Sequence, residues 1–404
     1  MEEQKGGTGR KILIIVENLP VPFDTRVWQE ATTLVENGYT VSVICPKGKG
    51  YEKEEEVLAG VHVYRHDLKT EGSGFVGYVK EYGSALYHEI RLAKKIYKEI
   101  GFDVIHGCNP PDDIYMVAKH FRRYGVRYVF DHHDICPELF EAKFGKRGLL
   151  YKSQLWLERQ TYRHAAFAFV TNESYKKIAI ERGGMEPAKV YVLRSGPRLE
   201  RLRIQEPKPE LKKGRKYMVG YLGVIGKQEG IPYLLEAARY IRNELHRDDI
   251  CYGIVGGGTS LEELKTLSVS MGIDDIVTFT GRAPDDVMLD YLNTADICVN
   301  PDEYNPMNDK STMNKVLEYM ALGKPIVQFD LTEGKYSAKE ASVYANPNDA
   351  VDMGKKIVEL LDNPQKRQEM SAYGRKRIVE ELSWEHTSKA LLAGYEAYFT
   401  GKFD

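Results

Sequence analysis

Residues 308–327, NDKSTMNKVLEYMALGKPIV, open with lysines, hydroxyls and amides and carry one carboxylate, Glu318, among the apolar residues that follow. With about 100° between successive residues, Lys315 and Glu318 share one face of a helix with Ser311. The N–H groups and partial positive charge of a helix N-terminus attract anions, and Lys310 and Lys315 strengthen this attraction. Glu318 is placed to accept the two hydroxyls of a sugar diol. This order predicts a site for a polyphosphate followed by a diol, as in a nucleotide; the alternative is a solvated polar face.

Three consecutive glycines, Gly256, Gly257 and Gly258, form a second candidate, since they end an apolar run and open a helical pattern. Glycine lets a backbone approach a bound ligand closely, so the run fits a nucleotide-binding turn. The Lys-Ser or Lys-Thr pair of a Walker A loop does not follow it, and a dehydrogenase would need an acidic partner that is not found. The glycines therefore favour ligand binding at a strand end without the chemistry of those two classes.

The elements that must position these residues follow an alternating pattern. Short apolar runs alternate with helical patterns along almost the whole chain, which is typical of a parallel sheet with helices on both faces. The expected strands are 11–17, 39–45, 61–64, 103–106, 127–133, 165–171, 189–195, 216–223, 249–258, 275–281, 295–301 and 325–330. The sequence thus predicts an α/β protein of two doubly wound Rossmann-like domains facing a cleft, with ligands at the carboxyl ends of the strands.

The alternation is interrupted once, by a charged stretch that contains prolines and has no apolar periodicity. We interpret this stretch, 198–215, as a linker between domains. The other expected parts are an N-terminal acceptor-side domain at 1–197, a donor-binding domain at 216–383, and a C-terminal helix at 384–404 that packs back toward the first domain.

Composition excludes several other classes of protein. The net charge of −2 argues against a general nucleic-acid binder, and no run of 18 apolar residues predicts a membrane-spanning helix. The N-terminus has no apolar core of a secretory signal. The five cysteines are odd in number and widely spaced, and no CxxC pair occurs. We expect free thiols and a cytoplasmic protein.

The stretch VLEYMALGKPIV, with its glutamate, resembles the carboxyl-domain signature of retaining GT-B glycosyltransferases, in particular the large family 4. Other stretches resemble that family in the same order along the chain: FDTRVWQEATTLVENGYTVSVIC, DVIHGCNPPDD, FDHHDICPE, VYVLRSGP, YLGVIGKQEGIPYLLEAA, IVGGGTSLEEL, FTGRAPDD and LSWEH. The resemblance covers nearly all 404 residues. It implies a GT-B fold and metal-independent transfer of a sugar from a nucleotide diphosphate.

The chain departs from the family pattern at three charged positions. The family signature is usually a glutamate, seven residues and a second glutamate; here the second is Glu318, but the first falls on Lys310. Much of the family has a GR…KG pair whose cations hold the diphosphate, and those places are Val224 and Glu229 here. Lys227, two residues before Glu229, could supply the missing charge. The donor pocket is therefore expected to differ from that of better-known members.

The resemblance implies roles for three groups of residues. The catalytic group is His133, Lys227 and Lys310. The donor-binding group is Glu318 as ribose ligand with Lys315, Ser311, Thr312, Gly226, Glu229, Gly256, Gly257, Gly258, Arg282 and Arg194. The acceptor-side group is Asp24, Arg26, His106, Asp131 and Asp134. Within these groups, Arg282 could stack on or bracket the base, which the family holds at the GRAP turn.

Simpler structural roles remain open for several of these residues. Asp24 could cap a helix, since aspartate is a preferred N-cap residue. His133 and His106 could be hydrogen-bonded structural histidines, and Lys315 could be a surface lysine. The cluster of His132, His133, Asp134 and Cys136 has a spacing that fits no usual zinc site. Because the family resemblance also implies metal-independent transfer, we expect no metal and no cofactor.

Residues 142–163, AKFGKRGLLYKSQLWLERQTYR, mix basic with large apolar side chains. Such a segment could lie on an anionic membrane, where lipid-linked acceptors are found. A solvated helix face is the alternative. If the first interpretation holds, the protein lies at the inner face of the cell membrane.

Together these observations predict a retaining glycosyltransferase. It would move a sugar from a UDP-sugar, or as a second choice from GDP-mannose, to a surface polysaccharide or a lipid-linked glycan. Two alternatives are a nucleotide-sugar epimerase of the same architecture and a non-catalytic protein that binds nucleotides or glycans. The altered charges at Lys310 and Glu229 are the reason to keep the second alternative.

Overall fold

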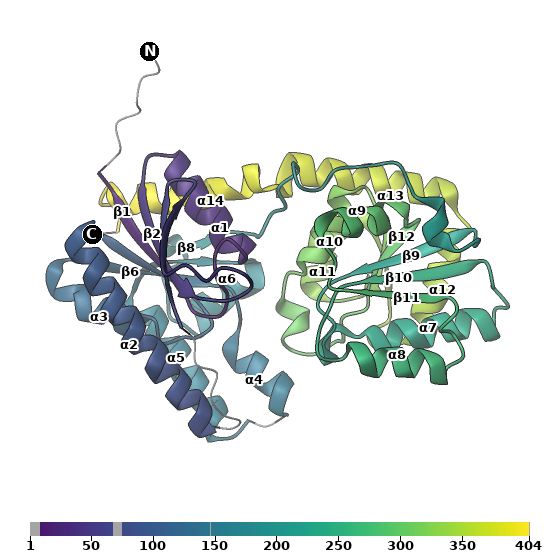
Figure 1. Ribbon diagram of the computed structural model, residues 1–404, viewed down its shortest axis with the longest axis horizontal. Coiled ribbons are helices and arrows are strands. Elements are labelled where there is room, and N and C mark those ends of the chain that lie inside the picture. Colours follow the sequence, from purple (N-terminus) through teal and green to yellow (C-terminus); the bar gives the residue numbers. More distant parts are fainter. Residues whose placement is uncertain (1–8, 68–74, 146, 404) are drawn as a thin grey trace, which may run out of the picture. The chain divides into compact units, whose positions relative to one another are not determined.

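The structure is a computed structural model that describes residues 9–67, 75–145 and 147–403 (Figure 1). The chain divides into two compact units. The first comprises Met1–Leu193 and Ser388–Asp404, and the second comprises Arg194–Thr387. Each unit has its own sheet.

An eight-stranded sheet forms the centre of the first unit, in the order β3-β4-β2-β1-β5-β6-β7-β8. Its strands are β1 (Lys11–Val16), β2 (Thr40–Pro46), β3 (Glu55–Leu58), β4 (Val61–His66), β5 (Val104–Cys108), β6 (Arg127–His132), β7 (Ala165–Val170) and β8 (Val190–Val192). Only β3 pairs antiparallel, with β4; the other neighbours are parallel. The connecting helices are α1 (Thr25–Glu36), α2 (Phe75–Glu99), α3 (Tyr115–Phe121), α4 (Cys136–Phe144), α5 (Leu149–His164) and α6 (Glu173–Glu181).

The second unit contains a six-stranded, fully parallel sheet in the order β11-β10-β9-β12-β13-β14. Its strands are β9 (Tyr217–Leu222), β10 (Ile250–Val255), β11 (Val277–Gly281), β12 (Ile297–Asn300), β13 (Ile326–Phe329) and β14 (Ser342–Ala345). Its helices are α7 (Ile231–Asn243), α8 (Leu261–Ser270), α9 (Asp285–Thr294), α10 (Asn314–Ala321), α11 (Thr332–Ala338), α12 (Ala350–Leu361) and α13 (Pro364–Arg377). The last helix, α14 (Trp384–Phe399), begins in the second unit and ends in the first.

Apolar side chains cover both faces of the second sheet. In β9, Val219 joins a buried cluster with residues of α7 and α12, whereas its neighbour Met218 joins a second cluster with residues of α9 and α10. Successive side chains of a strand point to opposite faces, so the sheet is buried on both sides. This explains why the strands read as continuous apolar runs and not as alternating ones.

The stretch 198–215 is part of the second unit. Leu202 is buried in the cluster that contains Met218, and the amide N–H of Lys208 donates to Thr294 Oγ1 at 2.8 Å. The segment interpreted from the sequence as a linker is therefore packed against α9.

Both sheets reverse their strand order at one point, and this reversal locates the candidate sites. In the first unit the reversal lies between β1 and β5, and in the second it lies between β9 and β12. Ligands of open α/β sheets bind outside the carboxyl ends of the strands at such a point. The candidate site of each unit therefore lies at the carboxyl edge of its own sheet.

Candidate active site

The loops after β9 and β12 meet at the reversal point of the second sheet. The loop after β9 contains a one-turn 3-10 helix, η4 (Lys227–Glu229), and the loop after β12 contains another, η5 (Asn308–Lys310). Asn308 Nδ2 donates to the carbonyl oxygen of Gln228 at 3.1 Å, which ties the two turns together. Lys227 and Lys310 therefore lie on adjacent turns at the edge where a ligand is expected.

Lys315, in the first turn of α10, is enclosed by acceptors. Its ammonium group donates to Glu229 Oε2 at 2.7 Å, to Asp302 Oδ1 at 2.9 Å and to Tyr221 Oη at 3.4 Å. An ammonium has three N–H donors, and these three contacts occupy all of them. The Lys315 side chain is only 8% exposed. The structure therefore corrects two expectations: Lys315 is not a surface lysine, and its charge is directed at carboxylates and not toward an open anion site.

This cluster carries two carboxylates for one ammonium, and that imbalance acts on Asp302. Burial raises the pKa of the Asp302 carboxyl to about 7, against the lowering effect of Lys315 and with a further rise from Glu229. Asp302 Oδ2 is buried and has no hydrogen-bond partner among the described residues. A proton on Asp302 near neutral pH would balance the charge of the cluster.

Glu318 lies one turn beyond Lys315 on α10, and its carboxylate accepts a hydrogen bond from a residue outside that helix. Arg201 donates through Nη1 to Glu318 Oε1 at 3.2 Å, and through Nε and Nη2 to Asp285 at 2.7 and 2.8 Å. The Glu318 side chain is 19% exposed. Burial raises the pKa of its carboxyl, whereas Arg201 lowers it. The Glu318 carboxylate is thus a partly exposed hydrogen-bond acceptor whose position is fixed by Arg201.

The segment before α10 differs from the expected continuous helix. The helix begins at Asn314, and Ser311 has extended backbone with φ −92° and ψ 137°. The Ser311 hydroxyl donates to the Met307 carbonyl at 2.8 Å, which fixes the preceding turn and separates it from α10. Ser311 and Thr312 therefore lie in the loop, and their N–H groups are not part of the helix N-terminus.

Arg194 lies against this loop and α11 within the second unit. Its guanidinium donates to Thr312 Oγ1 at 3.3 Å and to Glu333 Oε2 at 3.4 Å, and it stacks on the Tyr336 ring at 4.5 Å. Arg194 is buried. The side chain thus fixes the loop that carries Lys310 and Thr312.

The three glycines after β10 are explained first by packing of the protein against itself. A Cβ on Gly256 would lie 1.8 Å from the Gly223 carbonyl oxygen, and a Cβ on Gly258 would lie 2.3 Å from that of Ile225. Gly256 also has a φ of +143°. A Cβ on Gly257 would lie 3.2 Å from Arg282 Cβ. These glycines let the loop after β10 contact the loop that leads to Gly226 and Lys227.

In the first unit, Arg26 forms the centre of a buried charged cluster. The guanidinium contacts Asp131 Oδ1 at 2.8 Å and Glu30 Oε1 at 3.1 Å. Glu30 and Asp131 are fully buried. Burial raises the pKa of Glu30 well above its usual range, and the nearby Asp131 adds to the rise. Burial has the same effect on Asp131, but Arg26 and His133 outweigh it and hold the pKa of Asp131 well below its usual range.

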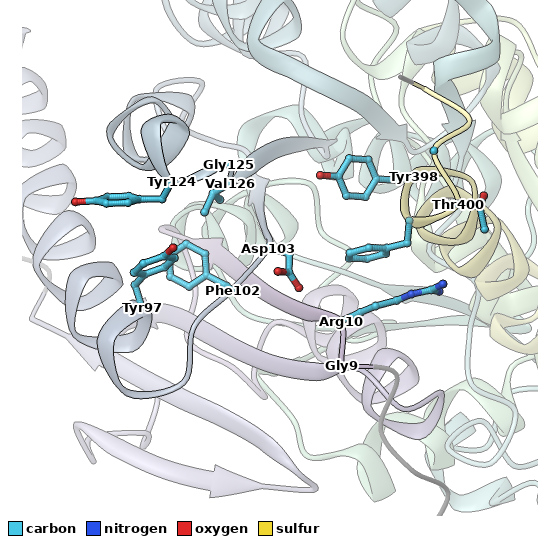
Figure 2. Close-up of a pocket in the computed structure, with 12 residues that line it drawn as sticks. Gly9, Arg10, Tyr97, Phe102, Asp103, Tyr124, Gly125, Val126, Tyr398 and Thr400 are labelled. Carbon is cyan, nitrogen blue, oxygen red and sulfur yellow. The ribbon is translucent and has the colours of Figure 1, made fainter.

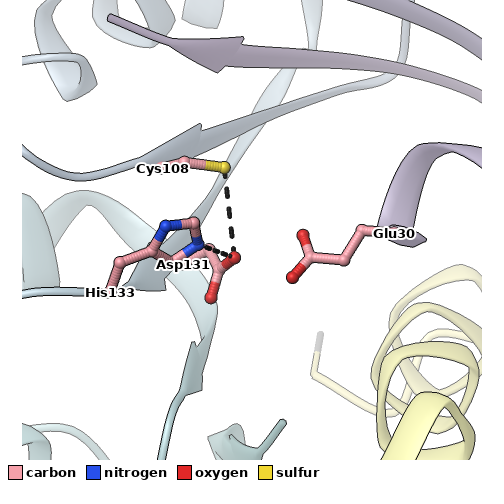
Figure 3. Close-up of side chains that lie close together, drawn as sticks. All are labelled: Glu30, Cys108, Asp131 and His133. Carbon is pink, nitrogen blue, oxygen red and sulfur yellow. Dashed lines mark hydrogen bonds and ion pairs between the residues drawn. The ribbon is translucent and has the colours of Figure 1, made fainter. Parts of the chain in front are cut away.

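His133 is the partly exposed member of this cluster (Figure 3). Its Nε2 lies 2.5 Å from Asp131 Oδ2, so the carboxylate orients the imidazole. His106 is fully buried, and its Nδ1 lies 2.6 Å from the hydroxyl of Tyr395 in α14. Burial lowers the pKa of His106. The sequence left two roles open for each histidine, and this geometry favours a structural role for His106 and leaves His133 accessible.

Glu30, Cys108, Asp131 and His133 bring four potential ligand atoms within 4.8 Å of one another, as a metal site would need (Figure 3). Arg26 already contacts both carboxylates, and burial raises the pKa of the Cys108 thiol well above its usual range. A metal ion there would have to coexist with the guanidinium and remove the thiol proton. The donor set therefore fits an arginine-centred ion cluster better than a metal centre.

The remaining two predicted residues of the first unit have local roles. Asp24 is the N-cap of α1 and accepts from the Val27 amide at 3.1 Å, as the capping interpretation requires. Asp134 lies in the loop after β6, where its backbone N–H donates to Asn109 Oδ1 at 3.2 Å and its carbonyl accepts from Asn109 Nδ2 at 2.7 Å. Asn109 thereby fixes the loop that carries His133.

Two family profiles match the sequence. The profile described as Glycosyltransferase Family 4 matches residues 24–201, and the profile described as Glycosyl transferases group 1 matches residues 216–363. The chain belongs to the family 4, group 1 glycosyltransferases.

Named relatives agree with this assignment. The glycosyltransferase is 24% identical over 296 residues to the alpha-maltose-1-phosphate synthase of Mycolicibacterium smegmatis, a match that covers 67% of this chain and 73% of that protein. It is 25% identical over 188 residues to a D-inositol 3-phosphate glycosyltransferase of Thermomonospora curvata, which covers 44% of this chain and 42% of that protein. The expected enzyme class, glycosyltransferase, is therefore confirmed.

Solved structures show the same fold. Sucrose-phosphate synthase from Thermosynechococcus elongatus matches the glycosyltransferase with a TM-score of 0.78 at 17% identity, over 97% of this chain and 99% of the other. The Anabaena protein Alr3699/HepE, in complex with UDP and glucose, matches with a TM-score of 0.72 at 13% identity, over 96% and 100%. The GT-B fold expected from the sequence is confirmed.

Four residues of these sites were missed by sequence reasoning. Glu30 lies four residues after Arg26 on α1, so an i,i+4 ion pair was the available signal. Asp302 directly follows Pro301 at the end of an expected strand. Arg201 lies in a stretch interpreted as a linker, and Tyr395 lies 289 residues from its partner His106. No sequence pattern indicated these last two contacts.

A cavity of about 750 Å³ lies at the opposite, amino-terminal edge of the first sheet (Figure 2). Its two charged side chains are engaged by neighbours, since Arg10 donates to Glu396 at 2.7 Å and Asp103 accepts from the Lys11 amide at 2.8 Å. Its other side chains include Tyr97, Phe102, Tyr124, Tyr398 and Phe399. The cavity lies away from the strand ends that carry the predicted site residues.

Proposed function

We propose that this glycosyltransferase transfers a sugar, with retention of its anomeric configuration, from a nucleotide diphosphate sugar. A UDP-sugar is the first choice of donor and GDP-mannose the second. The acceptor is a surface polysaccharide or a lipid-linked glycan. The observation that carries this proposal is the arrangement at the reversal point of the second sheet, where Lys227 and Lys310 lie on adjacent turns and Glu318 offers a carboxylate.

The diphosphate and the ribose of a nucleotide each have a counterpart in this arrangement. Lys227 has an exposed side chain. Lys310 lies on the neighbouring turn, which is hydrogen-bonded to the turn that carries Lys227. These two cations hold the diphosphate and stabilise its charge as the sugar departs. Glu318 accepts the ribose hydroxyls. Lys315 and Arg194 position the loops and do not contact phosphate themselves. In the first unit, His133 is the group that contacts a sugar.

The Anabaena protein, which has the same fold, is solved in complex with UDP and glucose, and this supports a uridine nucleotide as donor. At the donor site, Lys227 and Lys310 lie on adjacent turns and can supply the positive charge that a diphosphate needs, which supports metal-independent transfer. Neither Glu229 nor Lys310 matches the charge of the family pattern, so the sugar is left to experiment.

The experiment is a donor-turnover assay on the full chain with a panel of UDP-sugars and GDP-mannose. We expect slow hydrolysis of one donor without acceptor, faster turnover with a glycan acceptor, and an α-linked product from an α-linked donor by proton NMR. Glu318→Ala is expected to raise the donor KM about 10-fold or more, the effect of losing a hydrogen bond to a charged group. Conversion of the donor sugar to an epimer would support the first alternative. Binding of a nucleotide without turnover of any donor would support the second.

We also propose that α5 contacts an anionic membrane in this activity. Leu149 is 85% exposed and Trp156 is 55% exposed, and they share the helix surface with the exposed Lys152, Arg159 and Arg163. Lys146, in the same basic segment, lies outside the described residues. Exposed apolar groups between cations are typical of a helix that lies in a bilayer interface. None of the helices in the described ranges combines the length and apolar character needed to cross a bilayer.

Vesicle sedimentation tests this contact. We expect the full chain to bind phosphatidylglycerol vesicles more tightly than phosphatidylcholine vesicles, and less tightly as salt is added. Lys152→Ala with Arg159→Ala should weaken binding about 10- to 30-fold, since each cation near an anionic surface contributes about 1 kcal/mol. The matched control is Arg239→Ala with Lys355→Ala, two exposed cations of the second unit. Equal losses in both double variants would contradict an α5-specific contact.

A further inference from the structure

Arg201 links two elements of the predicted nucleoside site that are far apart in the sequence. Its Nε and Nη2 donate to Asp285 Oδ2 and Oδ1 at 2.7 and 2.8 Å, as a two-pronged pair. Its remaining Nη1 donates to Glu318 Oε1 at 3.2 Å. Asp285 is the first residue of α9 and directly follows the turn 281–284. The guanidinium thus connects the expected base-binding turn with the expected ribose ligand.

The orientation of Arg201 is set by more than one contact. Asp285 Oδ1 and Oδ2 fix the plane of the guanidinium, because a fork-to-fork pair of this kind is geometrically specific. The backbone N–H of Arg201 donates to the Arg198 carbonyl at 3.2 Å, and the neighbouring Leu202 is buried against the core. With Nε and Nη2 bonded to Asp285, Nη1 is the nitrogen that faces Glu318. The Arg201 side chain is 42% exposed, but these contacts fix both its backbone and its guanidinium group.

We propose that Arg201 is a positioning residue of the nucleoside site, which holds the Glu318 carboxylate oriented for the ribose hydroxyls. This inference depends on the proposed function, because it assigns a role within the same donor site. Arg201 contacts one oxygen, Oε1, and leaves Oε2 available. A carboxylate held in this way can still accept two hydroxyl donors, since each of its oxygens has two lone pairs.

The charge balance around Glu318 explains why the carboxylate needs Arg201. Burial raises the pKa of Glu318; Arg201 lowers it by charge and by hydrogen bond, Asp285 raises it, and Lys315 lowers it more weakly. Lys315 is already committed to Glu229 and Asp302. Removing Arg201 leaves burial and Asp285 to favour the protonated carboxyl. A protonated carboxyl loses part of its capacity to accept hydroxyl donors, so nucleotide affinity should fall as pH falls.

The test measures the Kd of UDP and of GDP by calorimetry from pH 5.5 to 8.5 on the full chain. We expect Arg201→Ala to weaken binding about 10-fold at the acidic end, the scale of one hydrogen bond to a charged group, and less at the alkaline end. The diphosphate also titrates in this range, so the ratio of variant to wild type at each pH is the quantity compared. Arg201→Lys should restore part of the affinity at low pH. Arg203→Ala, an exposed arginine two residues away, is the matched control and should change nothing.

A double-variant comparison separates positioning from general damage to the fold. Glu318→Gln has no carboxyl to titrate, so adding Arg201→Ala to it should produce little further loss, and the ratio of the two Kd values should not change with pH. An Arg201→Ala chain that binds as wild type at every pH, or binds more tightly because the arginine only occupied the ribose position, would overturn the proposal. A wild-type chain that binds neither UDP nor GDP would instead overturn the proposed function.

Discussion

Lys227→Ala and Lys310→Ala are each expected to lower kcat for glycosyl transfer about 100- to 1000-fold, the usual effect of removing one group that stabilises developing charge. The two lysines lie on turns joined by the hydrogen bond between Asn308 Nδ2 and the Gln228 carbonyl. The departing nucleotide diphosphate gains negative charge in the transition state, so the loss should appear in kcat more than in KM. Steady-state kinetics with the donor found in the panel measures both constants.

The control for this prediction is Lys265→Ala, a surface lysine on α8 that pairs only with Glu262 at 2.8 Å among the contacts described. It should leave both constants unchanged. Thermal unfolding should be the same for Lys227→Ala and wild type, because the Lys227 side chain is exposed. If both lysine variants keep more than a third of the wild-type kcat, the diphosphate is held elsewhere and the assignment of the two cations is wrong.

Lys315→Met is expected to destabilise the protein by about 3–5 kcal/mol, the usual effect of removing one partner from a buried ion pair. The substitution leaves Glu229 and Asp302 without the ammonium that contacts both at 2.7 and 2.9 Å. Urea unfolding monitored by circular dichroism measures the free energy of unfolding. The triple variant Lys315→Met, Glu229→Gln, Asp302→Asn should recover most of the loss, because no buried charge remains.

The destabilisation should also depend on pH. In the wild type, the pKa of Asp302 is raised from 3.8 to about 7, so the folded state holds this proton more tightly than the unfolded chain does. The free energy of unfolding then falls as pH rises through that interval. Without Lys315 the pKa of Asp302 rises further, and the loss should be larger at pH 8 than at pH 5. If Lys315→Met is as stable as the wild type at pH 8, Lys315 does not neutralise Glu229 and Asp302 in a buried cluster.

The fold was predictable because the sheets are parallel and buried on both faces. Strands such as KILIIV appear as short apolar runs separated by helical patterns, and this pattern does not depend on distant contacts. The elements that were missed lack this signal. The strand β3 contains two glutamates at the edge of its sheet, and β14 is only four residues long. Residues 350–377 form two helices, because Pro364 starts α13 after an Asn363 cap.

The candidate sites were predictable only where the signal was local. Helical spacing placed Lys315 and Glu318 on one face, but the partner of Lys315, Glu229, is 86 residues away, and Arg201 is 117 residues from Glu318. Likewise, Arg26 and Asp131 were each noticed, while their ion pair joins residues 105 positions apart. The sequence shows which side chains could carry charge. It does not show which residue of opposite charge pairs with each of these side chains. This pairing decides whether a lysine is available to bind phosphate or instead stabilises a loop.

The central claim is that a nucleotide diphosphate binds at the carboxyl edge of the second sheet. A crystal structure of the full chain with UDP, or with GDP if the donor panel favours guanosine, tests it most directly. We expect the diphosphate to lie within hydrogen-bond distance of Lys227 and Lys310. Both ribose hydroxyls should contact Glu318, with Arg201 still bound to that carboxylate. A nucleotide bound at any other edge, or a ribose that does not contact Glu318, would contradict it.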